Sequence, residues 1–141
     1  MHTKRIAIIY SDFYKEEMAE MVSYTKQELL SFGIAEQQIT LYPVPGAFEI
    51  PLIGSALAAS KAVDALIGLG IIIEGQTHHA RLVAENCARG MMDIQTTYAI
   101  PFVNEVLYVD RRELAHARLS KGKDAARACR DSLALLDSMQ S

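Results

Sequence analysis

The chain alternates short apolar runs with longer segments in which apolar residues recur at helical spacing. The short runs predict four strands, at residues 5–11, 38–44, 65–73 and 101–109. The first and third runs are apolar almost throughout, which is typical of strands that are buried on both faces of a sheet. The second contains Pro43, which indicates an edge strand or a strand end, because proline has no N–H group for a ladder bond.

The segments with helical spacing predict five helices. They are expected at about residues 15–31, from the turn at 45–51 to about 61, and at about 78–96, 111–118 and 124–139. Gly33 should end the first helix, and Pro51 is tolerated only in the first turn of the second. The apolar stripes that should face the core of the three longest helices are Met18, Met21, Val22, Thr25 and Leu29; Val83, Cys87, Met91 and Ile94; and Ala125, Cys129, Leu133 and Leu136.

Strands that alternate with amphipathic helices predict an α/β fold, a three-layer α/β/α sandwich around a four-stranded parallel sheet. Right-handed crossovers leave few topologies, and we expect the flavodoxin-like strand order 2-1-3-4, which puts Pro43 at an edge. No linker or low-complexity segment divides the chain, so residues 1–141 should form a single domain. Ligands of such sheets bind at the carboxyl ends of the strands, near the switch point between the first and third strands.

Composition narrows the classes of function. The formal net charge of -3 gives no electrostatic footprint for nucleic acid. No apolar run is long enough for a signal peptide or a membrane span. Cys87 and Cys129 have neither metal-ligand nor disulfide spacing, so a reduced protein of the cytoplasm is expected. The sequence has no GxGxxG, P-loop, zinc or Ser/His/Asp pattern, and we expect neither a metal nor a cofactor.

The segment after the third strand carries the strongest chemical signal. Gly75, Gln76 and Thr77 precede a predicted helix, whose free N–H groups and positive dipole end suit a phosphate. Thr77 is the expected N-cap. His78 and His79 follow in the first turn, where the positive helix end disfavours an imidazolium and leaves a proton acceptor. The competing interpretation is that Thr77 only caps the helix and that both histidines are solvated.

The segments after the first two strands offer groups for a planar, hydroxylated ligand. Phe48 can stack on a ring, and Glu49 can accept hydrogen bonds from hydroxyl or amide groups. Alternatively, Phe48 belongs to the core and Glu49 only complements a helix dipole. Phe13, beside the expected switch point, is a second stacking candidate, although an aromatic there more often packs on its own helix.

A basic cluster near the C-terminus comprises Arg118, Lys121 and Lys123. Such clusters form anion clamps in some proteins. More often they are solvated residues at helix ends. The residues alone therefore predict an α/β domain with an anion site, a neutral histidine and aromatic stacking groups.

Two stretches resemble the lumazine synthase family. Residues 44–51 (VPGAFEIP) are similar to the segment after that family's second strand, and residues 69–79 (LGIIIEGQTHH) to its third strand and phosphate loop. The resemblance implies condensation of 5-amino-6-ribitylaminouracil with 3,4-dihydroxy-2-butanone 4-phosphate. The products are 6,7-dimethyl-8-ribityllumazine, phosphate and water. It also implies that no cofactor is used, and that the enzyme is a homopentamer or a multiple of one, with sites at subunit interfaces.

The resemblance assigns a role to each matching position. His79, not His78, matches the histidine that transfers protons. The substrate-binding positions are Phe13, Ala47, Phe48, Glu49, Ile72, Ile73 and Asn104. The phosphate-binding positions are Gly75, Gln76, Thr77, Arg118 and Lys123, with Arg118 reaching the site of a neighbouring subunit.

The chain departs from the family pattern at three places. Asn104-Glu105 replaces a frequent aromatic-glycine pair, residues 106–109 replace a segment where threonines are usual, and residues 120–123 shorten a glycine-rich connection. Two other functions are therefore kept open. One is a non-catalytic flavin- or lumazine-binding module on the same scaffold, and the other is a riboflavin synthase of the pentameric type.

Overall fold

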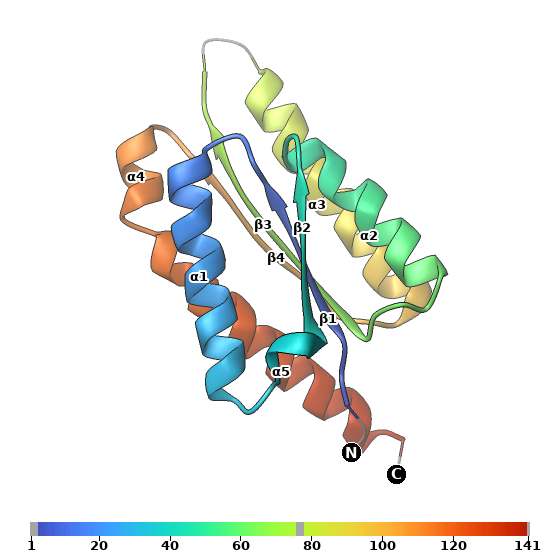
Figure 1. The fold of residues 1–141 in the computed structure, drawn as a ribbon. Coiled ribbons are helices and arrows are strands. Elements are labelled where there is room, and N and C mark those ends of the chain that lie inside the picture. Colours follow the sequence, from blue (N-terminus) through green and yellow to red (C-terminus); the bar gives the residue numbers. More distant parts are fainter. Residues whose placement is uncertain (1–2, 76–77, 141) are drawn as a thin grey trace.

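The computed structural model describes residues 3–75 and 78–140 of the chain (Figure 1). Within these ranges, four strands form one parallel sheet in the order β2-β1-β3-β4, which confirms the predicted topology. The strands are Ile6–Ser11 (β1), Ile39–Val44 (β2), Ala65–Ile73 (β3) and Phe102–Val109 (β4). Pro43 lies on the edge strand β2, opposite Tyr10 of β1. Its missing N–H group therefore costs no bond to a further strand.

Helices cover both faces of the sheet and complete the expected three layers (Figure 1). On one face lie α1 (Lys15–Ser31), α4 (Arg112–His116) and α5 (Gly122–Ser138). On the other lie α2 (Ile50–Ala59) and α3 (His79–Tyr98). Short 3-10 turns are found at Glu36–Gln38 (η1), Ala47–Glu49 (η2) and Leu119–Lys121 (η3). None of the helices in the described ranges has the length and apolar character needed to cross a membrane.

Each face of the sheet has its own core cluster. One lies beneath α1 and α5 and includes Ile8, Met21 and Leu69, and the other lies beneath α2 and α3 and includes Ile9 and Met91. The five residues predicted to face inward from α1 are all buried. The predicted stripes of α3 and α5 are also buried, except that Val83 and Leu136 are only half-buried.

Several helix ends differ from the predicted ones by one or two residues, among them the end of the second helix and the start of the last. The second helix ends at Ala59 because Lys61 adopts a left-handed conformation with φ of 58°, and the Lys61 N–H group donates to the Ala58 carbonyl. The last helix begins two residues early, at Gly122. A Cβ at Gly122 would lie 2.6 Å from the Met21 carbonyl oxygen, so the absent side chain lets α5 approach α1.

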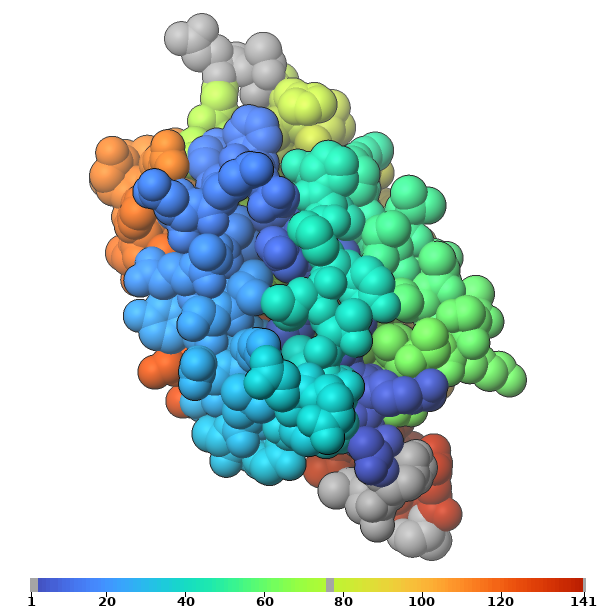
Figure 2. Space-filling view, viewed as in Figure 1, coloured from blue at the N-terminus to red at the C-terminus, as the bar shows by residue number. Residues whose placement is uncertain are grey.

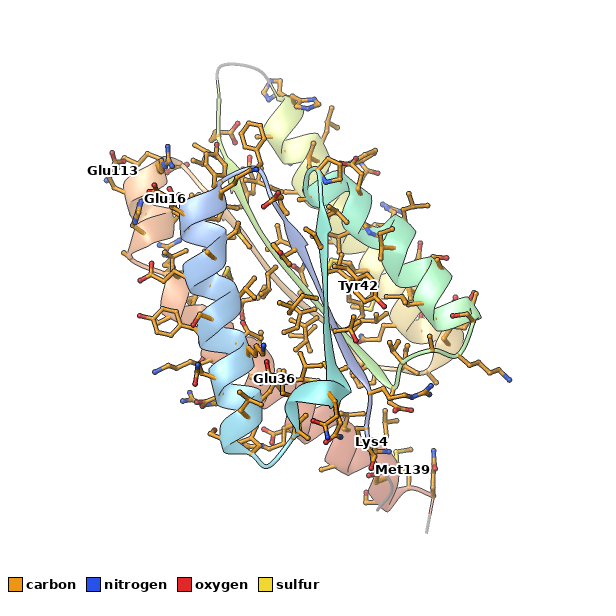
Figure 3. The ribbon with its side chains drawn as sticks, viewed as in Figure 1. Lys4, Glu16, Glu36, Tyr42, Glu113 and Met139 are labelled. Atoms are coloured by element: carbon orange, nitrogen blue, oxygen red, sulfur yellow. The ribbon has the colours of Figure 1, made fainter. Side chains whose placement is uncertain are left out.

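The carboxyl ends of all four strands meet at one end of the molecule (Figure 1). There β1 leads into α1, β2 into η2, β3 towards α3 and β4 towards α4. Lys4 and Met139 lie at the opposite end, near the two termini, and Tyr42 lies midway along the edge strand β2 (Figure 3). The connections at the carboxyl end carry most of the candidate residues, as the fold predicts.

Candidate active site

The connection after β1 holds Phe13 at the carboxyl end of the sheet. The Asp12 N–H group donates to the Val44 carbonyl at 2.8 Å, and the Phe13 N–H group donates to Ser11 Oγ at 3.4 Å. The Phe13 ring is 71% exposed and meets the Tyr14 ring edge to face, with 4.9 Å between centroids. Phe13 is therefore not a core residue, and its exposed side chain is available to a planar ligand.

The connection after β2 forms a tight turn that directs Glu49 back over its own backbone. The Glu49 N–H group donates to the Gly46 carbonyl at 3.1 Å. A Cβ at Gly46 would lie 3.3 Å from Glu49 Oε1, so the carboxylate lies over this glycine. Ala47 is buried, whereas Phe48 is 58% exposed. Exposure of Phe48 excludes the alternative in which it belongs to the core.

The connection after β3 brings His79 to the same end of the sheet. The N-cap position of α3 falls on His78 rather than on Thr77 as predicted, because the His78 carbonyl accepts a helical bond from the Leu82 N–H group at 3.1 Å. His79 is the first helical residue, and its side chain is exposed. Of the three residues predicted to bind phosphate in this connection, Gly75 is exposed. Gln76 and Thr77 lie outside the described residues.

Two adjoining hollows lie between these connections. A hollow of about 230 Å³ is lined by Ser11, Phe13, Tyr14, Gly46, Ala47, Ile71, Ile72, Ile73, His79, Ala80 and Val83. A second, of about 590 Å³, is lined by Gly46, Ala47, Phe48, Glu49, His79, Leu82, Val83 and Asn86. Gly46, Ala47, His79 and Val83 line both hollows. The structure therefore brings together seven of the predicted residues, which are Phe13, Ala47, Phe48, Glu49, Ile72, Ile73 and His79.

A carboxylate that sequence reasoning missed lies where β3 ends. The Tyr108 hydroxyl donates to Glu74 Oε2, and the Gly75 N–H group donates to Glu74 Oε1 at 3.2 Å. The Tyr108 hydrogen bond holds the pKa of Glu74 below its usual value, so this carboxyl is ionised at neutral pH. Tyr108 lies opposite Ile72 in the β3–β4 register, so the pair links the ends of two neighbouring strands.

Four other predicted residues, among them Gly75, do not line either hollow of their own chain. Asn104 lies opposite Gly68 on β4, and its Oδ1 accepts the Val106 N–H group at 2.9 Å. Arg118 lies between α4 and η3 and is exposed. Lys123 Nζ lies 5.4 Å from the centroid of the Tyr24 ring, against α1.

The chemistry available at the hollows is proton transfer and the positioning of a flat, polar ligand. His79 can exchange protons, Phe13 offers a ring face, and Glu49 offers carboxylate oxygens. Burial raises the pKa of Cys87 to about 11 and that of Cys129 to about 12, which makes both thiols poor nucleophiles. Within the described ranges no cluster of His, Cys, Asp or Glu has an arrangement that could hold a metal ion.

A parallel α/β sandwich with such a site at its carboxyl end defines an enzyme-like domain for small molecules. The family model for 6,7-dimethyl-8-ribityllumazine synthase matches residues 3–137. The synthase of that name from Stenotrophomonas maltophilia is 37% identical to this chain, over 96% of this chain and 90% of the relative. The synthase from Albidiferax ferrireducens is 38% identical, over 94% of this chain and 85% of the relative. The Verminephrobacter eiseniae synthase is 43% identical over 79% of this chain and 73% of its own. The chain belongs to the lumazine synthase family.

Proposed function

We propose that the chain condenses 5-amino-6-ribitylaminouracil with 3,4-dihydroxy-2-butanone 4-phosphate. The products are 6,7-dimethyl-8-ribityllumazine, phosphate and water. The proposal is supported by a family match over nearly the whole chain. The observation that carries it is that Phe13, Ala47, Ile72, Ile73 and His79, which lie at or just beyond the carboxyl ends of three different strands, line one hollow.

Each of the predicted residues in the hollows has a role in substrate binding or proton transfer that fits its chemistry. Phe13 stacks on the pyrimidine ring, while Ala47, Phe48 and Glu49 hold the ring and the ribityl chain. Imine formation, loss of phosphate and ring closure all require proton transfers, and His79 supplies them. Holding both substrates side by side supplies much of the remaining rate acceleration.

The substrate phosphate is bound by residues 75–77 together with Arg118 and Lys123. A guanidinium forms charge-assisted and often bidentate bonds to phosphate, which suits Arg118 to this role. Arg118 does not line the hollows of its own chain. Arg118 therefore acts in the site of a neighbouring copy, and each complete site lies between two subunits.

The protein assembles as a homopentamer, or as a multiple of one, in the cytoplasm. Apolar side chains on and beside α2 and α3 support the assembly, since Phe48, Leu52, Leu82 and Met92 are each more than half exposed in a single chain. An interface that covers them removes that apolar surface from water. Head-to-tail contacts that close produce a ring.

The direct test mixes both substrates with the purified protein. The absorbance of the lumazine and the release of phosphate are recorded together. We expect lumazine and phosphate to appear in equal amounts. Lumazine binding without any turnover would instead indicate the non-catalytic module, and formation of riboflavin from lumazine would indicate a riboflavin synthase.

A further inference from the structure

A buried carboxylate outside the two hollows joins the first turn of α1 to α4. Glu17 is only 1% exposed. Arg112 Nη2 donates to Glu17 Oε1 at 2.9 Å, and Arg112 Nε donates to Glu17 Oε2. His116 Nε2 lies 3.2 Å from the same Oε2 atom. We call Glu17, Arg112 and His116 the α1–α4 clamp.

The clamp has the geometry of a specific joint between two helices. Two nitrogen atoms of Arg112 each donate to a different oxygen of the Glu17 carboxylate, which fixes orientation as well as distance. Arg112 and His116 are four residues apart, so they project from one face of α4. Burying a carboxylate is costly unless it is paired and hydrogen-bonded, so removal of either partner disfavours this arrangement.

The α4 helix is short, and its core contacts come from Leu114 and Ala115. It spans five residues, of which Ala115 alone is fully buried. The first turn of α1 and α4 lie side by side at the carboxyl end of the sheet in both the ribbon and the space-filling views (Figures 1 and 2). Glu16 and Glu113, which are next in sequence to Glu17 and Arg112, lie close together in the same part of the molecule (Figure 3). The clamp therefore acts together with these core contacts to fix the position of α4.

The clamp is connected through α4 to Arg118 and through Tyr14 to Phe13. The Arg118 N–H group donates to the Ala115 carbonyl at 2.9 Å, which ties the Arg118 backbone to α4. On the other side, the Arg112 guanidinium lies 5.1 Å from the centroid of the Tyr14 ring, and Tyr14 packs against Phe13. A shift of α4 would therefore displace Arg118 directly and Phe13 only through Tyr14.

We propose that Glu17 is a positioning residue, which acts through Arg112 to hold Arg118 where it meets the substrate phosphate. This inference rests on the proposed function of Arg118. Glu17 itself touches no substrate. Its effect should appear in the binding of the phosphate-bearing substrate and not in the proton transfers made by His79.

The test compares Glu17→Gln with Glu28→Gln, which removes a similar ion pair from the other end of α1. Arg127 Nε donates to Glu28 Oε2 at 2.8 Å, and this pair ties α1 to α5 far from the hollows. We expect Glu17→Gln to raise the KM for the butanone phosphate about fivefold, as a misplaced charge-assisted contact does. The kcat and its pH profile should stay near wild-type values, and Glu28→Gln should leave the KM unchanged.

Arg112→Gln and the double variant show whether Glu17 acts through Arg112. We expect the double variant to have the same KM as either single variant, because all three break one joint. If the two effects multiply, or if Glu17→Gln and Glu28→Gln both keep the wild-type KM, the clamp is only a structural tether and the proposal is wrong.

Titration with inorganic phosphate separates this proposal from the proposed reaction. Calorimetry on the assembled protein should give a Kd for phosphate that is raised about fivefold by Glu17→Gln and not by Glu28→Gln. A wild-type protein that makes no lumazine but shows this difference would refute the reaction and support the clamp. Equal phosphate affinities in all three proteins would overturn the clamp even in an active enzyme.

Discussion

His79 and Ala47 line both hollows at the carboxyl end of the sheet, although one follows β3 and the other follows β2. The two connections meet there because β2 and β3 flank β1 in the sheet and run parallel to each other. His79 is thus within reach of a ligand in either hollow. Its role as the proton-transfer group is open to direct measurement.

We expect His79→Ala to lower kcat by about 10²–10⁴-fold, the range typical of a lost general acid–base group. The fold should be unaffected, since the His79 side chain is exposed. His78→Ala is the matched control, and it should retain most of the activity. Steady-state kinetics on both variants checks the assignment, which is wrong if they are equally active or if His78→Ala is the slower enzyme.

Arg118→Lys should raise the KM for the butanone phosphate by about tenfold, because an ammonium keeps the charge but loses the bidentate fork. Arg130→Lys provides a control on α5, where the Arg130 guanidinium stacks 4.1 Å from the centroid of the Phe32 ring, away from the site. Initial rates at varied butanone phosphate distinguish the two. An unchanged KM in Arg118→Lys would remove Arg118 from the phosphate site.

The ion pair of Glu17 should make stability depend on acid pH. The Arg112 hydrogen bond lowers the pKa of Glu17 from 4.5 to about 2. A lowered folded-state pKa stabilises the fold above pH 4.5, and this contribution is lost as the pH falls towards 2. Because Arg112 is half exposed, we expect Glu17→Gln to lower the free energy of unfolding at neutral pH by about 1–3 kcal/mol.

Urea denaturation of wild type and Glu17→Gln at pH values from neutrality down to about 3 measures this effect. The two curves of unfolding free energy against pH should converge as the medium becomes more acidic. A constant gap between them would mean that Glu17 does not titrate as the buried partner of Arg112.

The fold was predictable because its signals are local. Continuous apolar runs identified buried strands, and Pro43 identified the edge, so the strand order followed from few alternatives. Glu17 had a partial signal, since it precedes the buried Met21 by four residues and so shares its stripe on α1. Its partner Arg112 is remote in sequence, and no periodic pattern could connect the two. Without that partner, a carboxylate in an apolar stripe has no evident role.

The site was predictable only where a strand end determines position. Phe13, Phe48 and His79 lie within a few residues of strand ends, and the parallel sheet brings them to the two adjoining hollows. Arg118 follows a helix whose placement depends on side-chain pairing, so the sequence could assign it a role only by resemblance. The Glu74–Tyr108 pair depends on the β3–β4 register, which was not predicted.

Assembly can be measured without substrates. Light scattering on dilute protein should give a mass of about 78 kDa, five times the 15.6 kDa of one chain, or a multiple of it. Apolar side chains such as Leu52 and Leu82 should become protected from solvent in that ring. A mass near that of one chain, in a protein that retains full activity, would refute shared sites.

The most direct test of the central claim, a lumazine-forming site built from two copies of the chain, is complementation between two inactive variants. His79→Ala and Arg118→Ala chains are co-expressed in equal amounts with different tags, and the mixed oligomers are assayed for lumazine formation. In a closed ring about a quarter of the interfaces should join an intact His79 to an intact Arg118, so about a quarter of wild-type activity should return. Mixed oligomers as inactive as each variant alone would contradict the shared site.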